Sequence, residues 1–94
     1  MEEKIQLKHP QGKKATCISK AKYDTMKAAM LASLSEKGEL THKEMLQAIV
    51  GHFKNNKIQF DGAVEWYMES VKLDLEANQV IKRIPGKPLA QYSL

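Results

Sequence analysis

Residues 60–78, FDGAVEWYMESVKLDLEAN, have the apolar spacing of an amphipathic helix, and the predicted fold is organised around them. At 3.6 residues per turn, apolar side chains spaced by three and four residues fall on one face. That core-facing stripe consists of Val64, Tyr67, Met68, Val71 and Leu75. We expect this stretch to be the longest helix of the chain, with the Asp61 carboxylate accepting hydrogen bonds from its first turn.

The opposite face of the same predicted helix is also partly apolar, because it carries Trp66 and Leu73. An acidic edge separates the two faces and is formed by Glu65, Glu69 and Glu76. Large apolar patches are seldom left exposed to water. This second face is therefore expected either to pack beneath the N-terminal segment or to bind a partner. The candidate protein-interface residues are Trp66, Leu73, Ser70 and Ala77.

Another helix is predicted over residues 20–37. Ser19 precedes it as an N-cap, and Gly38 follows it as a residue that tolerates the left-handed conformation ending many helices. Its inner stripe consists of Tyr23, Met26, Met30 and Leu34. This stripe is expected to face the core.

Between these two helices, residues 41–44 read Thr-His-Lys-Glu, which is a capping box. In this motif the Thr41 hydroxyl accepts a hydrogen bond from the backbone of the first turn, and the Glu44 side chain reaches back to the backbone N–H of Thr41. Leu40 and Met45 occupy the two positions of a hydrophobic staple. A helix is therefore predicted to start here and to end in the polar turn at residues 54–57.

Short β-rich runs flank the three predicted helices. Alternating residues 4–8 and 14–18 surround a turn that contains Pro and Gly, which predicts an N-terminal β-hairpin. A second hairpin is predicted within residues 79–94, around another Pro-Gly turn. Cys17 is expected to be a small buried strand residue.

This order predicts the α+β fold class and a single domain over residues 1–94. Residues 1–18 form the N-terminal hairpin, residues 19–78 the three helices and residues 79–94 the C-terminal hairpin. A chain of 94 residues is large enough for one modest core.

The composition points to the cytoplasm. No stretch approaches the ~20 apolar residues that a membrane-spanning helix requires. The start, MEEKIQLK, lacks the apolar core of a signal peptide. The single cysteine cannot form an internal disulfide, which suits a reducing compartment. We expect no membrane partner.

Charge is distributed unevenly along a chain whose net charge is +4. Residues 60–78 contain one lysine and five acidic residues, a net charge of −4. Residues 79–94 contain Lys82, Arg83 and Lys87 and no acidic residue, a net charge of +3. The acidic charge of the central helix argues against simple DNA binding, since neutralising phosphates supplies most non-specific affinity.

No recognised catalytic or metal-binding pattern is present in the sequence. His9, His42 and His52 lack companion ligands at the short spacings of metal sites, and His52 is expected to be a packed or interface residue. There is no Gly-rich phosphate loop and no nucleophile motif. We therefore predict a non-enzymatic protein with no catalytic residues, no metal, no cofactor and no small-molecule substrate.

With this order of elements, the chain resembles the winged helix-turn-helix superfamily over about residues 19–94. The passage VKLDLEANQVIKR, at residues 71–83, joins the end of a third helix to a basic strand in the manner frequent in that superfamily. The chain is also similar to a small bacterial family of uncharacterised winged-helix proteins. That likeness rests on the stretches HPQGKK, KAKYD, GELTHKE and FDGAVEWYMESVKLDLEA.

The superfamily resemblance implies a three-helix winged-helix domain with its third helix in the major groove of double-stranded DNA and its wing on the backbone. The positions that would face the groove hold no Arg, Lys, Asn or Gln to read a purine edge; they are Asp61, Gly62, Ala63, Glu65, Trp66 and Glu69. The tentative nucleic-acid contacts are the wing residues Lys82, Arg83 and Lys87, with His42 and Lys43 at the start of the second helix.

Two functions remain open from the sequence. The first is a DNA-binding module, like a transcription regulator, that dimerises so that weak half-sites add. The alternative is a module for protein interaction or homodimerisation that uses the same scaffold without binding DNA. A positive strip joining the wing to the third helix would favour the first. A monomer with Trp66 buried beneath the N-terminal hairpin would remove the main support for the second.

Overall fold

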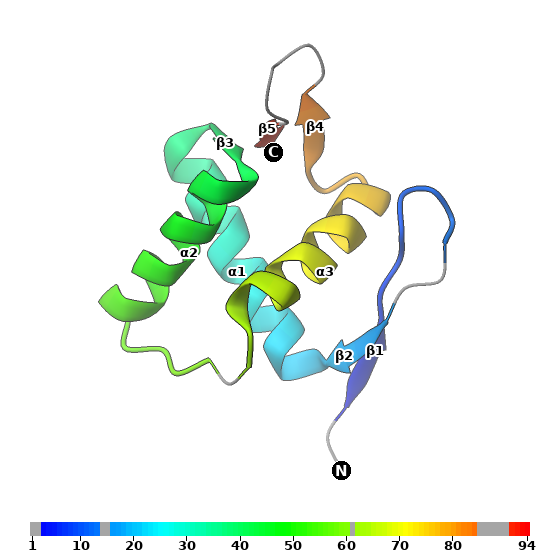
Figure 1. Cartoon of the computed structure of the whole chain (residues 1–94), viewed down its shortest axis with the longest axis horizontal. Coiled ribbons are helices and arrows are strands. Elements are labelled where there is room, and N and C mark those ends of the chain that lie inside the picture. Colours follow the sequence, from blue (N-terminus) through cyan, green and yellow to red (C-terminus); the bar gives the residue numbers. More distant parts are fainter. Residues whose placement is uncertain (1–2, 14–15, 61, 85–90) are drawn as a thin grey trace.

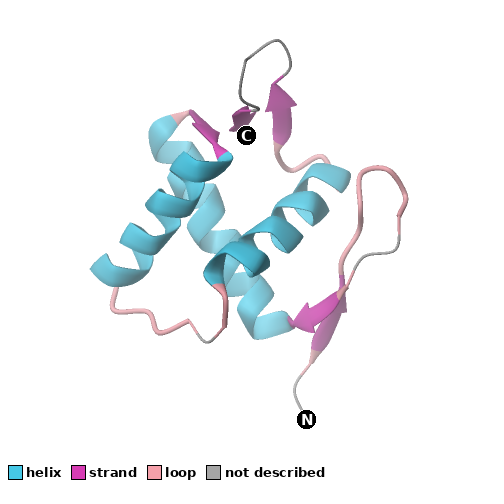
Figure 2. Cartoon of the chain, in the orientation of Figure 1, coloured by secondary structure: helices cyan, strands magenta, loops and turns pink. Residues whose placement is uncertain are grey.

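The computed structural model describes residues 3–13, 16–60, 62–84 and 91–94. It is an α+β fold with three helices and two small antiparallel sheets (Figures 1 and 2). The elements in chain order are β1 (Lys4–Gln6), β2 (Cys17–Ser19), α1 (Lys20–Lys37), β3 (Glu39–Thr41), α2 (His42–Asn55), α3 (Val64–Ala77), β4 (Lys82–Ile84) and β5 (Gln91–Ser93). None of the helices in these ranges has the length and apolar character needed to cross a membrane.

Local capping sets the ends of α1 and confirms the predicted boundaries. The Ser19 hydroxyl accepts from the backbone N–H of Lys22 at 3.5 Å. At the other end, Gly38 has a φ of 87° and donates its N–H to the Leu34 carbonyl. A residue with a Cβ would be strained in this conformation, so the glycine ends the helix where the sequence indicated.

The predicted capping box also begins α2. The Thr41 hydroxyl accepts from the Glu44 N–H at 3.2 Å, and the Glu44 carboxylate accepts from the Thr41 N–H at 3.0 Å. Leu40 and Met45, the expected staple pair, are both buried. The helix ends at Asn55, within the predicted polar turn.

The α3 helix is shorter than predicted and starts later. It has 14 residues against 18 for α1, so the expectation that it is the longest helix is wrong. Its N-cap is Ala63, and the residue expected to cap it, Asp61, lies outside the described residues. Gly62 explains the late start, because its φ of 113° is incompatible with a helical backbone.

A strand between the first two helices was not predicted. β3 pairs with β5, and β5 pairs with β4, giving a three-stranded sheet in the order β3-β5-β4. The register places Tyr92 of β5 between Leu40 of β3 and Arg83 of β4. Three residues carry too little alternation to signal a strand, and the partner of β3 lies at the other end of the chain.

The N-terminal hairpin is present, with strands shorter than predicted. Ile5 pairs with Ile18, and Gln6 pairs with Cys17. The expectation that Cys17 is buried is wrong: Ile18 is buried, and Cys17 is exposed with its thiol donating to the Gln6 side-chain oxygen at 2.9 Å. Successive strand side chains point to opposite faces, so burial of Ile18 turns Cys17 outward.

One core lies where the three helices meet. The predicted stripe of α1 is buried, as are Met45, Ile49 and Phe53 of α2. In α3, Met68, Val71 and Leu75 are buried, whereas Val64 and Tyr67 at its start are half-buried. Leu7 and Ile18 close the core on the side of the N-terminal hairpin, and Ile81 and Tyr92 close it on the side of the three-stranded sheet. The outer surface of α3, which carries Glu65 and Trp66, lies outside this core.

Candidate interaction surface of the third helix

Trp66 is the most prominent side chain on the outer surface of α3, and 49% of it is exposed. Its ring meets the edge of the Tyr67 ring at a centroid distance of 4.9 Å. Tyr67 in turn packs edge-on against Phe60 at 5.2 Å, and Phe60 stacks on the buried Phe53 at 5.4 Å. The indole is therefore held at the outer end of an aromatic chain that reaches the core.

The expectation that this face packs beneath the N-terminal segment holds over part of it. The N-terminal hairpin lies beside the C-terminal half of α3 (Figure 1), where the Lys8 N–H donates to the Asp74 carboxylate at 2.8 Å. Ala77 lines a depression there together with residues of the hairpin loop. Ser70 and Leu73 are half-buried. The hairpin thus covers the end of the predicted interface near Ala77, whereas Trp66 remains exposed.

The Asp74 carboxylate, which is 3% exposed, joins three segments of the chain. One oxygen accepts from the Lys8 N–H of the hairpin, and the other accepts from the Tyr23 hydroxyl of α1 at 2.6 Å. Burial, and then the hydrogen bond to Asp74, raise the pKa of Tyr23 well above that of an ordinary phenol. Sequence reasoning counted Asp74 only toward the net charge of residues 60–78 and missed this role.

A second polar cluster joins the start of α2 to the acidic edge of α3. Lys72, only 4% exposed, donates to the Glu69 carboxylate at 3.3 Å and approaches Nδ1 of His42 at 3.2 Å. Its ammonium also lies 4.6 Å from the centre of the Tyr92 ring. The other His42 nitrogen, Nε2, lies 3.2 Å from the Glu65 carboxylate. We call His42, Glu65, Glu69 and Lys72 the His42 cluster.

This arrangement leaves the exposed part of α3 acidic. The one lysine of the helix is buried and paired, whereas Glu65 is exposed and Glu69 and Glu76 are half-buried. His42, a tentative nucleic-acid contact, has both ring nitrogens directed at side chains of the His42 cluster. Among the described residues of α3, no free cation is available to continue a positive strip from the wing.

The remaining predicted cations lie along the three-stranded sheet and at the start of α2. Lys82 and Arg83 are exposed on β4, and Lys43 is exposed in the first turn of α2; within the described ranges none of the three forms an ion pair. The sheet connects them, because β3 leads directly into α2 and is joined to β4 through β5. Lys87 lies outside the described residues.

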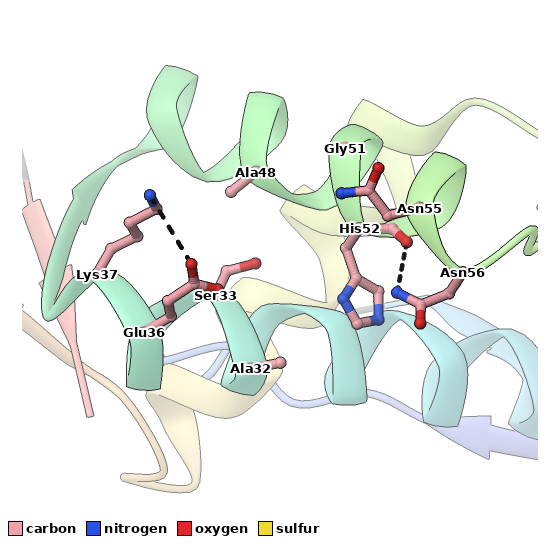
Figure 3. A pocket seen from close by; sticks show the side chains of 9 residues that line it. All are labelled: Ala32, Ser33, Glu36, Lys37, Ala48, Gly51, His52, Asn55 and Asn56. Atoms are coloured by element: carbon pink, nitrogen blue, oxygen red, sulfur yellow. Dashed lines mark hydrogen bonds and ion pairs between the residues drawn. The ribbon is translucent and has the colours of Figure 1, made fainter.

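A depression between α1 and α2 holds the other histidine of interest (Figure 3). It is lined by Ala32, Ser33, Glu36, Lys37, Ala48, Gly51, His52, Asn55 and Asn56. The half-buried His52 ring points toward α1, as expected for a packed histidine. Asn56 and Ser33 bond to carbonyls of their own helices. Within the part of the chain that the structure describes, no group of three His, Cys, Asp or Glu residues could hold a metal ion.

The fold and this surface define a small α+β domain whose third helix presents an aromatic, acidic face. The chain belongs to DUF6958, a family of unknown function whose model matches residues 4–91. Neither the curated proteins nor the solved structures include a significant match.

Proposed function

We propose that this chain is a non-enzymatic protein-interaction module on a winged-helix scaffold, in which the outer face of α3 binds a basic, partly apolar segment of a partner protein. The observation that carries the proposal is the exposure of Trp66 beside Glu65, on a helix whose single lysine is buried. An indole held by packing is suited to recognition, because little conformational entropy is lost when it is covered.

The order of elements supports the choice of scaffold. A helix, a strand, two helices and a two-stranded hairpin follow one another, and the isolated strand joins the hairpin in one sheet. This agrees with the winged-helix resemblance. Because one scaffold serves many functions, the partner must be argued from the site itself.

The charge of the face supports a basic protein segment over a DNA groove. Glu65 and Glu69 would lie among phosphates if α3 entered the major groove, and like charges brought together there oppose binding. A Lys or Arg of a partner would instead pair with these carboxylates and lie over the Trp66 ring. Apolar partner side chains would cover the remainder of the indole.

The test uses Trp66 as its own probe, since it is the only tryptophan of the chain. The protein is titrated with a synthetic amphipathic peptide of Arg, Leu and Ala, and in parallel with the same peptide carrying Glu in place of Arg. We expect a saturating change in indole emission with the basic peptide only. Equal responses to both peptides, or none to either, would contradict the proposal.

A charge-reversal pair then locates the site. Glu65→Lys on α3 is expected to weaken binding of the basic peptide, whereas Glu36→Lys on α1, also at an exposed carboxylate, leaves it unchanged. Equal losses in the two variants would indicate attraction to the whole molecule rather than to α3. Light scattering of the free protein identifies a second copy of this chain as the partner if dimers form and Glu65→Lys abolishes them.

A second candidate function is binding of double-stranded DNA, which is favoured by the exposed Lys82 and Arg83 on the C-terminal hairpin. Lys43 lies in α2, directly after β3, and β3 belongs to the same sheet as that hairpin. If the hairpin contacts phosphates, binding to random duplex DNA falls steeply with salt. Replacing Lys82 and Arg83 together by Ala would then flatten the dependence of log K on log salt by about two units. No binding at low salt would remove this candidate.

A further inference from the structure

The His42 imidazole lies between one hydrogen-bond donor, the Lys72 ammonium, and two acceptors, the carboxylates of Glu65 and Glu69. An ammonium can only donate hydrogen bonds, so Lys72 at 3.2 Å requires Nδ1 of His42 to accept. The ring proton must then be on Nε2, where it donates to Glu65 at 3.2 Å. The neutral Nε2–H tautomer therefore satisfies Lys72 and Glu65, while the same Nδ1 also lies 3.3 Å from the Glu69 carboxylate.

The doubly protonated ring fits a different set of partners. Its Nδ1 would carry a proton and could no longer accept from Lys72, but Glu69 lies 3.3 Å from the same nitrogen. Nε2 would continue to donate to Glu65. Protonation therefore exchanges a Lys72 contact for a Glu69 contact and places two carboxylates against one imidazolium.

The groups around His42 come from each element near it. Glu65, Glu69 and Lys72 belong to α3. Lys43 follows it in α2, and Glu44 in the same turn is engaged by Thr41 in the capping box. On the sheet side, the Tyr92 ring of β5 lies against the Lys72 ammonium. Of these, Glu65 and Glu69 border the exposed Trp66.

We propose that His42 is a pH-dependent switch that sets the charge of the Trp66 face and thereby its affinity for a basic partner. With neutral His42, Glu65, Glu69 and Lys72 together carry one negative charge. Protonation cancels that charge and occupies both carboxylates, so attraction to a cationic segment falls. Histidine is the side chain that changes charge between about pH 5 and pH 8. This inference rests on the proposed function of the α3 face.

The experiment measures the affinity of the Arg-, Leu- and Ala-containing peptide at pH 8 and pH 5.5, in the wild type and in two histidine variants. One surface charge is worth up to about 1 kcal/mol, so wild-type affinity is expected to fall about two- to fivefold on acidification. His42→Gln should remove this pH dependence. The matched control His52→Gln, on the other side of α2, should retain it.

A wild type whose affinity does not change with pH, or a His42→Gln variant that keeps the full change, would overturn the switch. Glu65→Gln provides a second variant at an exposed position in case His42→Gln does not fold. It is expected to reduce the pH dependence because one of the two carboxylates is gone. An undiminished dependence in Glu65→Gln would count equally against the switch.

Imidazole ¹⁵N NMR of the free protein separates the switch from the proposed function. The Nε2–H tautomer at pH 8, replaced by the doubly protonated ring at pH 5.5 with a simultaneous shift of the Lys72 ammonium signal, supports the switch without any partner. If that change is seen and the peptide binds at no pH, the proposed function fails alone. If another tautomer dominates at pH 8, the switch fails whatever the peptide does.

Discussion

Both oxygens of the Asp74 side chain are used inside the protein, by a backbone N–H of the N-terminal hairpin and by a hydroxyl of α1. A buried carboxylate is stabilising only when its hydrogen bonds are made, and each group that loses its partner keeps the cost of having left water. The contacts of Asp74 therefore link the hairpin, α1 and α3 through one side chain.

Replacing Asp74 by Ala is expected to lower the free energy of unfolding by about 2–4 kcal/mol, because Lys8 N–H and the Tyr23 hydroxyl lose their acceptor. Urea denaturation followed by circular dichroism measures the change. Asp24→Ala is the matched control, since Asp24 is exposed and, among the described residues, pairs with the exposed Lys20. Similar losses in the two variants would show that Asp74 does not have this linking role.

Tyr23 should make stability depend on pH in the alkaline range. Its pKa is raised in the folded protein, so the unfolded chain loses the phenol proton first. The stabilisation is complete below the ordinary phenol pKa of about 10 and is lost as pH rises from there towards the folded value. Urea denaturation between pH 8 and pH 11 should show a shallower decline for Tyr23→Phe than for the wild type.

At the scale of elements, two glycines have opposite consequences. Gly62, before α3, has a φ of 113°, and a Cβ placed on it would lie 2.7 Å from a ring carbon of Tyr67. Gly51, within α2, has no atom near its Cβ position. The first position needs glycine for both backbone and space, whereas the second gains helical propensity from a side chain.

Gly62→Ala is therefore expected to destabilise the protein by about 1–3 kcal/mol, and Gly51→Ala to stabilise it by about 0.5–1 kcal/mol. Thermal unfolding of the two variants beside the wild type shows whether each substitution raises or lowers the stability of the fold. Since Tyr67 supports the indole, Gly62→Ala should also shift the Trp66 emission, and Gly51→Ala should not. Stabilisation by Gly62→Ala would refute the constraint before α3.

At the scale of the whole molecule, the core is rich in methionine. Met26, Met30, Met45 and Met68 come from all three helices, and each is 0% exposed. Methionine fills irregular space where helices cross, and its sulfur is protected from oxidants only while the fold is closed. The core therefore offers a measure of global opening.

We expect these four methionines to oxidise slowly in dilute peroxide and to react together when urea unfolds the protein. Peptide mass spectrometry measures each site. The exposed Cys17 is the control, because alkylation of its thiol should be fast with or without urea. Rapid native oxidation of Met68 alone would show that α3 detaches from the other helices.

Local chemistry made several features predictable from the sequence. The ends of α1 and the start of α2 depend on Ser19, Gly38 and the Thr41–Glu44 capping box, each of which acts within a few residues of itself. The three helices, their order and both hairpins followed from apolar spacing and turn residues. The late start of α3 was missed because the positive φ of Gly62, which lies outside the helical range, cannot be deduced from helical spacing.

The sequence alone thus determined the fold class, the capping of the first two helices and the acidic character of the third helix, α3. Tertiary structure decided the burial of Asp74 and Lys72, the pairing of β3, the partners of His42 and the exposure of Trp66. The physical reason is the range of the interactions: caps and helical stripes join neighbours in the chain, whereas these contacts join segments that only folding brings together.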